Sequence, residues 1–192
     1  MKVRLLAAAL AVVSGVGCTP EWARESDTDV YLSMDIAGGA AGGTGSTTQL
    51  LSDPRTPTIV NDNASLSFRL FPKNPTLAIN NTGLVNDIIL RRYTIRYYRA
   101  DGRNVEGVDV PYSISGDMNV RIPATGAVVT TSVIVVRHAA KLEPPLRNFV
   151  NAGGMDVLTM YADITVYGET ISQKAVQARG SLEIVFIDFL DT

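Results

Sequence analysis

Cysteine, histidine and tryptophan are nearly absent from this 192-residue sequence, which has one residue of each type. A single cysteine, Cys18, excludes a disulfide framework and a cysteine-rich zinc site within one chain. A single histidine, His138, likewise excludes a multi-histidine metal site, and a cysteine–histidine catalytic pair is excluded unless Cys18 supplies the thiol. We therefore expect no metal and no cofactor.

The sequence also lacks an excess of charge of one sign. Its 17 Lys and Arg nearly balance 19 Asp and Glu, which gives a formal net charge of −2. Proteins that bind nucleic acid normally carry a basic excess on one face, so we expect no nucleic-acid partner. Hydrophobic residues make up 46% of the chain and charged residues only 19%, a composition typical of folded proteins.

The N-terminal residues follow the plan of a secretory signal peptide. The stretch MKVRLLAAALAVVSGVGC begins with two basic residues, continues with an apolar segment from Leu5 to Val13, and ends in small residues before Cys18. The apolar segment is far shorter than the roughly 20 residues that a membrane-spanning helix needs. The sequence thus predicts a signal peptide over residues 1–17 and export of the mature chain.

The position of Cys18, directly after the small residues, resembles the lipobox of bacterial lipoproteins. The resemblance implies cleavage before Cys18, acylation of this residue as a membrane anchor, and a polar tether over residues 18–28. Thr19, rather than Asp, after the cysteine implies the outer membrane, with the domain facing the periplasm or the cell surface. Gly15 stands where the lipobox usually has Leu. Because Gly15 and Gly17 also suit an ordinary signal peptidase, a soluble exported protein stays open as an alternative.

Loss of the signal peptide would change the charge of the chain. Without residues 1–17, 15 Lys and Arg stand against 19 Asp and Glu, a net charge of −4. No second cysteine is present to form a disulfide bond, so the mature domain must be held together by its hydrophobic core. About 160 residues are enough to bury one.

Alternating apolar and polar residues, typical of half-buried β-strands, recur along the mature chain. The clearest cases are 29–36 and 157–168, where apolar residues stand at every second position. Val133 to Val136 is apolar on both faces, so we expect its strand at the centre of a sheet. A flexible glycine-rich loop over 37–48 and one short helix over 143–152 separate strands. The strands are expected at 29–36, 64–71, 91–99, 108–115, 118–122, 128–137, 157–168 and 181–189.

Strands that are not separated by helices favour an all-β fold. The pattern predicts a single domain over 29–192, an antiparallel β-sandwich of about eight strands with one short helix, similar to immunoglobulin-like or fibronectin type III-like modules. The stretches RADGRNVEGVDVPY, VRHAAKLEPPLRNF and ADITVYGETISQKAVQARGSLEIVF resemble those of an uncharacterised family of exported bacterial proteins. This resemblance covers most of residues 64–190. It implies a shared fold and export and carries over no activity.

Two groups of residues suggest catalysis or metal binding as alternatives. His138 is the sole candidate for a general base at neutral pH, which would make the protein an exported hydrolase, although no G-x-S-x-G turn accompanies it. Oxygen-bearing side chains between 101 and 109 resemble a Ca²⁺-binding loop, but their spacing differs from that of an EF-hand and favours an ordinary polar hairpin loop. The side chains are those of Asp101, Asn104, Glu106 and Asp109.

A surface rich in tyrosine and arginine is the strongest candidate for a binding site. If the strand at 91–99 pairs with the strand at 157–167, their outward-facing side chains share one surface. Tyr and Arg are enriched at binding hot spots, whereas aromatic side chains also cover solvated sheets in ordinary cross-strand pairs. The candidate residues are Arg92, Arg96, Tyr98, Tyr161 and Tyr167.

The last predicted strand, 181–189, is apolar on both faces. Either the helix covers its outer side or the strand is a docking edge for another protein.

Taken together, the sequence predicts a non-enzymatic, lipid-anchored envelope protein whose β-sandwich binds or scaffolds another envelope component. A carbohydrate-binding module that uses the tyrosine and arginine surface is the first alternative, and a hydrolase that uses His138 is the second.

Overall fold

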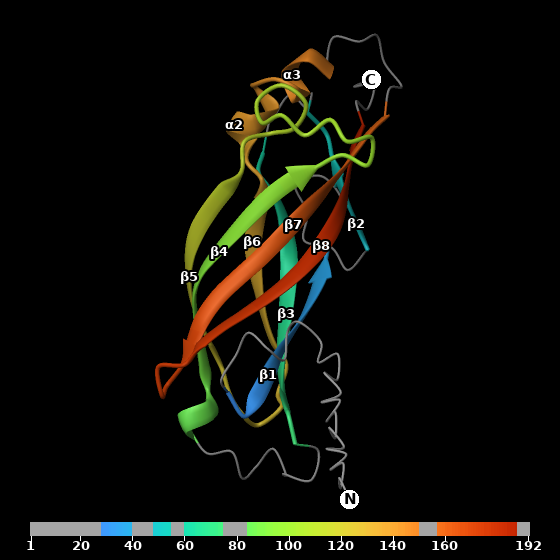
Figure 1. The fold of residues 1–192 in the computed structure, drawn as a ribbon. Helices are drawn as coiled ribbons and strands as arrows, with labels where there is room; N and C mark the ends of the chain where they lie inside the picture. The colour runs from blue at the N-terminus through green and yellow to red at the C-terminus, as the bar shows by residue number, and fades with distance from the viewer. Residues whose placement is uncertain (1–27, 40–47, 55–59, 75–83, 150–156, 188–192) are drawn as a thin grey trace, which may run out of the picture.

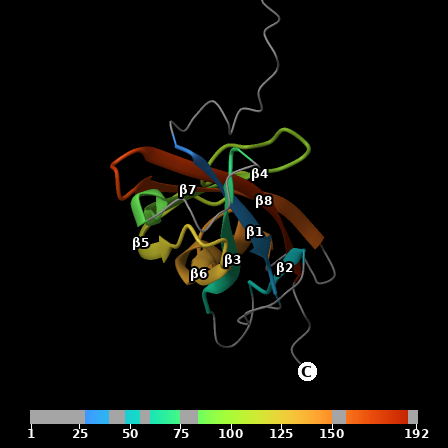
Figure 2. The same cartoon turned by 90° about the horizontal axis from the view of Figure 1, so that it is seen from below.

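The computed structural model describes residues 28–39, 48–54, 60–74, 84–149 and 157–187, which form two β-sheets. The three-stranded sheet has the order β1-β3-β6 and the five-stranded sheet the order β2-β8-β7-β4-β5. Figures 1 and 2 show the sheets as two layers. The strands are β1 (Val30–Ala37), β2 (Gln49–Ser52), β3 (Asp62–Pro72), β4 (Ile88–Tyr98), β5 (Ile114–Ile122), β6 (Val129–Val136), β7 (Val157–Thr170) and β8 (Ala175–Ile187).

Three helices of about one turn complete the described part of the chain. They are η2 (Leu84–Asn86), α2 (His138–Lys141) and α3 (Leu146–Phe149). Helices α2 and α3 lie together at one end of the layers, and η2 lies at the other end (Figure 1). Among the described residues, no helix is long and apolar enough to span a membrane.

The all-β, sandwich-like architecture predicted from the sequence is confirmed. It is not wholly antiparallel, because β2 pairs with β8 in the parallel direction. Strand β2 was not expected, and only the ends of the predicted glycine-rich loop at 37–48 lie within the described residues. The predicted signal peptide and nearly all of the tether lie outside them.

The core forms where the inward residues of the two sheets meet. In β7, Met160, Ala162, Ile164 and Val166 are fully buried, and the residues between them face outward, as the alternation predicts. Leu66, Phe68 and Leu70 of β3, together with the neighbouring strands, supply the opposite layer and are also fully buried. Burial of such side chains supplies most of the favourable free energy of folding.

The prediction of a strand over 108–115 is wrong. Only an isolated bridge between Glu106 and Val110 forms there, and a single strand, β5, covers 114–122 in place of two shorter ones. Gly107 has a positive φ of 75°, and the Asp109 carboxylate accepts a hydrogen bond from the backbone N–H of Val105 at 3.2 Å. These features turn the chain and leave Val108 65% exposed.

Strand β6 is an outer strand of the three-stranded sheet, so the prediction of a central position is also wrong. The pairing of β6 with β3 skips Val135, because Asp62 faces Val136 and Asn63 faces Ile134. This irregularity lets two consecutive residues, Val135 and Val136, both be buried. The apolar run therefore reflects a bulge and not burial of both faces in the centre of a sheet.

The helical segment differs from the single helix predicted over 143–152. Two separate turns form, α2 before the proline pair and α3 after it, and residues 150–156 lie outside the described residues. Pro145 has no backbone N–H to donate and so cannot extend a hydrogen-bonded helix from α2. Its place directly before α3 suits the start of a helix.

The apolar last strand is not a free docking edge at its C-terminal end. Residues Glu183 to Phe186 of β8 pair with β2 on one side and with β7 on the other. Strand β8 also begins earlier than predicted, at Ala175, so that β7 and β8 form one long hairpin. The predicted Phe189 lies outside the described residues.

Tyr97 links the two sheets through the core. Its side chain extends from β4, and its hydroxyl donates a hydrogen bond to the backbone carbonyl of Val135 in β6. Burial raises the pKa of Tyr97 well above its ordinary value of 10.0, and the charge of Arg137 offsets only part of this effect. The hydroxyl therefore stays protonated in the folded state at a pH where an unfolded chain loses the proton.

We expect Tyr97→Phe to lower the free energy of unfolding at neutral pH by about 1–3 kcal/mol, because the Val135 carbonyl loses its donor. The stabilising effect of the raised pKa is complete below about pH 10 and is lost as pH rises through the higher folded-state pKa. Urea denaturation at neutral and alkaline pH should therefore show a smaller difference between wild type and variant at alkaline pH. A difference that stays constant up to about pH 11 contradicts this account.

Candidate binding face on the five-stranded sheet

The strand pairing brings the five predicted tyrosine and arginine residues onto one surface. Strands β4 and β7 are antiparallel neighbours, with Arg92 opposite Tyr167, Arg96 opposite Asp163 and Tyr98 opposite Tyr161. These side chains, together with the outward ones of β8, form the solvent-facing side of the five-stranded sheet, which we call the outer face. The pairing on which the sequence prediction depended is thus observed.

A register shift in β4 sets which residues face outward. Ile88 and Leu90 are buried, but so are Ile95 and Tyr97, which a regular alternation would place on opposite sides. The ladder shifts between Leu90 and Arg92, and beyond this point Arg92, Arg96 and Tyr98 point to solvent.

Aromatic side chains contact their neighbours at both ends of the outer face. The Tyr98 and Tyr161 rings stack with their centroids 5.3 Å apart and their planes at 22°. The Tyr98 hydroxyl lies 3.2 Å from the Ser181 hydroxyl of β8. At the other end, the Arg92 guanidinium carbon lies 4.8 Å from the Tyr167 ring centroid, a cation–π contact. These four side chains are thus held by one another or by Ser181.

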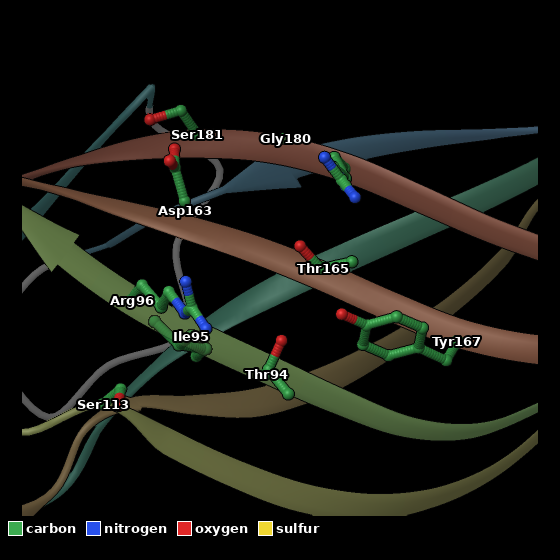
Figure 3. Close-up of a pocket in the computed structure, with 10 residues that line it drawn as sticks. Thr94, Ile95, Arg96, Ser113, Asp163, Thr165, Tyr167, Gly180 and Ser181 are labelled. Carbon is green, nitrogen blue, oxygen red and sulfur yellow. The ribbon is translucent and has the colours of Figure 1, made fainter. Parts of the chain in front are cut away.

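Between these ends the outer face is hollowed. The hollow has a volume of about 680 Å³, within the range of roughly 300–1,000 Å³ that is common for small-ligand sites. Figure 3 shows its side chains, with the Asp163 carboxylate directed toward β8 and the Tyr167 hydroxyl toward Thr165. The polar lining residues are Thr94, Arg96, Ser113, Asp163, Thr165, Tyr167, Arg179 and Ser181.

The charged side chains of the hollow form no direct ion pair with one another. Within the described part of the chain, no side-chain hydrogen bond, ion pair or ring contact engages Arg96, Asp163 or Arg179. Four arginines elsewhere on the surface have acidic partners, namely Arg91 with Glu169, Arg99 and Arg103 with Asp101, and Arg121 with Asp87. The hollow therefore offers donors and an acceptor that are free to bind a ligand.

Asp163, Thr165 and Arg179 extend the candidate site beyond the residues chosen from the sequence. The alternation in β7 already placed the first two on the outward side, and only their pairing partners show that they line a hollow. Arg179 fell outside the last predicted strand, although Gln177 and Arg179 alternate with the buried Val176 and Ala178. Gly180 has no side chain to continue this alternation, and the last strand was predicted to begin only at Ser181.

His138 lies away from the outer face, as the first residue of α2. It is exposed, and its backbone N–H donates to the Asn61 side chain at 2.7 Å. Among the described residues, no carboxylate or hydroxyl is hydrogen-bonded to its imidazole. This placement supplies no base–nucleophile pair in the part of the chain that can be described.

The oxygen-rich loop at 101–109 uses its side chains to hold its own conformation. Asp101 forms ion pairs with Arg99 at 2.6 Å and Arg103 at 2.9 Å, and these contacts lower the pKa of its carboxyl well below the usual range. The Asn104 side chain accepts a hydrogen bond from the Arg99 backbone at 2.7 Å. Across the described segments, no group of three or more His, Cys, Asp or Glu residues is placed to hold a metal ion.

No family model matches the chain, and no curated protein sequence does. Cys18, the predicted site of lipid attachment, lies outside the described residues.

Proposed function

We propose that the chain is a non-enzymatic, lipid-anchored protein of the bacterial envelope that binds another envelope component through the outer face. The proposed binding role rests on one observation, the hollow across β4, β7 and β8. Three charged side chains that line it, Arg96, Asp163 and Arg179, have no partner among the described residues. Unpaired charged groups on a sheet are available to a ligand, and the sheet has already fixed their backbones, which removes part of the ordering cost of binding.

The domain type that we propose is an immunoglobulin-like or fibronectin type III-like sandwich. Its support is the stacking of a three-stranded and a five-stranded sheet with mostly antiparallel neighbours. In such a scaffold the sheet face provides a rigid platform for a ligand, and the tether at 18–28 would link this platform to the membrane.

The hollow favours carbohydrate binding as a second candidate function. Tyrosine rings, hydroxyl groups and charged side chains with free hydrogen-bonding capacity are the groups that a sugar ring and its hydroxyls can contact. The partner would then be a glycan of the envelope.

The anchor is tested by Cys18→Ser in the native cells. We expect the wild-type chain to fractionate with the outer membrane and the variant to be released. Multiple acyl chains attach the wild type stably to a membrane, whereas the variant carries no acyl chain. Blocking lipoprotein processing should leave a larger precursor of the wild type. A variant that stays membrane-bound, with unchanged mobility of the wild type, contradicts the lipid anchor.

The released Cys18→Ser chain also tests binding without the anchor. It should sediment with isolated cell envelopes when the two are mixed. A chain that stays in the supernatant with every envelope fraction contradicts the binding function and leaves the anchor unaffected.

A further inference from the structure

We propose that the hollow binds an acidic saccharide, with Arg96 and Arg179 engaging its anionic group and Asp163 accepting hydrogen bonds from its hydroxyls. This inference rests on the proposed binding function of the outer face and names the chemical class of the ligand.

The charge of the hollow is opposite to that of the chain. Its lining contains two arginines and one aspartate, an excess of one positive charge, whereas the whole chain has a net charge of −2. A guanidinium presents planar, paired N–H donors that match a carboxylate, phosphate or sulfate group. Because Arg96 and Arg179 have no acidic partner among the described residues, an anion would not need to displace one.

The geometry places the two arginines on either side of the central strand β7. Arg96 of β4 is opposite Asp163, and Arg179 of β8 is opposite Thr165, so the arginines are offset by one outward position along β7. Neighbouring strands are about 4.8 Å apart, which puts the backbones of β4 and β8 about 10 Å apart. A ligand lying across β7 thus meets Arg96 on one side, Arg179 on the other, and Asp163 and Thr165 beneath it.

The rest of the lining favours a hydroxyl-rich ligand over a peptide. Thr94, Ser113, Thr165 and Ser181 contribute hydroxyl groups, each of which can donate and accept. The backbone groups of β7 are engaged in ladders with β4 and β8, so this central strand has no free edge to which a peptide strand could add. Tyr167 lies at one end of the labelled lining residues (Figure 3), and its ring is in contact with the Arg92 guanidinium.

Matched pairs of saccharides test the inference. Oligosaccharides of uronic acids and the same oligosaccharides after carboxyl reduction are titrated into the Cys18→Ser chain by calorimetry, with sulfated and phosphorylated saccharides as further arms. We expect the acidic member of a pair to bind at least about tenfold more tightly, and Arg96→Gln and Arg179→Gln each to weaken its binding by about tenfold. Arg91→Gln is the matched control, because Arg91 lies on the same strand but pairs with Glu169 and does not line the hollow.

Any of the following outcomes overturns the inference. Equal binding of acidic and reduced saccharides, or arginine variants that bind like the control, removes the role of the two guanidinium groups. An acidic peptide is titrated in parallel, and tighter binding of this peptide than of any saccharide assigns the hollow to a peptide. If no saccharide binds while the chain still sediments with envelopes, the ligand class is wrong and the proposed function stands. Thermal unfolding of each variant verifies that the fold is retained.

Discussion

Replacing Lys141 with methionine should lower the free energy of unfolding by about 3–5 kcal/mol, because it removes a buried cation that contacts the buried carboxylate of Asp62. The side chains of Lys141 and Asp62 are 1% and 0% exposed, with Nζ 2.9 Å from Oδ2. The contact is an ion pair between two buried side chains.

This ion pair lies where both sheets and a helix meet. Lys141 is on α2 and Asp62 is on β3, and the Ser52 hydroxyl of β2 donates a hydrogen bond to the same Asp62 oxygen at 2.5 Å. The three side chains therefore tie the five-stranded sheet, the three-stranded sheet and α2 together at one end of the domain.

Chemical denaturation of three variants tests this role. Removing both charges, as in Lys141→Met with Asp62→Leu, should recover much of the loss, since the buried carboxylate is removed together with the cation that it contacts. Arg103→Ala is the control, because it breaks an exposed ion pair and should cost at most about 1 kcal/mol. A loss for Lys141→Met no larger than that of the control would contradict this account.

Filling the hollow should abolish binding to the envelope. Thr165 is half-buried at the centre of the outer face, opposite Thr94 in β4 and Arg179 in β8. Thr165→Trp puts a large ring into the hollow, and tryptophan is well accepted in β-strands, so the fold should be retained. We expect affinity for the envelope to fall at least about 30-fold, the loss typical of a binding hot spot.

The matched control for this variant is Ser132→Trp. Ser132 is exposed on β6, in the other sheet, so the same ring is added to a strand away from the hollow. Co-sedimentation of the two variants with isolated envelopes separates a blocked site from a general effect of the added ring. If both variants lose affinity for the envelopes to the same extent, or if neither loses it, the hollow is not the binding site.

The alternation in the sequence was sufficient to predict the outer face but not the hollow. Residues 157–168 alternate without interruption, so their inward and outward sides were predicted correctly, as was the pairing that joins Arg92 to Tyr167. The hollow depends in addition on Arg179, whose strand pairs with β7 in a register that no local pattern specifies. The sequence therefore predicted the tyrosines and arginines of β4 and β7 and missed Arg179, which lies on β8, on the other side of β7 from β4.

Other features depend on contacts between residues far apart in the sequence. Strand β2 has four residues, too few for an alternation to be visible, and Gln49 meets Glu183 across 134 positions. Lys141 is a charged residue in a short polar segment, and its buried position depends on contact with Asp62 of β3, which is far away in the sequence. The bulge at Val135 likewise arises from pairing with β3, so the apolar run was interpreted as a central strand.

The most direct test of the binding face is an NMR titration of the isotope-labelled Cys18→Ser chain with soluble glycans released from the envelope of its native cells. We predict that amide shifts will change mainly at Thr94–Arg96, Asp163–Tyr167 and Arg179–Ser181, which line the hollow, and that Thr165→Trp will remove these changes. Changes concentrated on the three-stranded sheet or on the loop between β4 and β5 would contradict the assignment of the outer face as the binding site. No changes at all would contradict a glycan as its ligand.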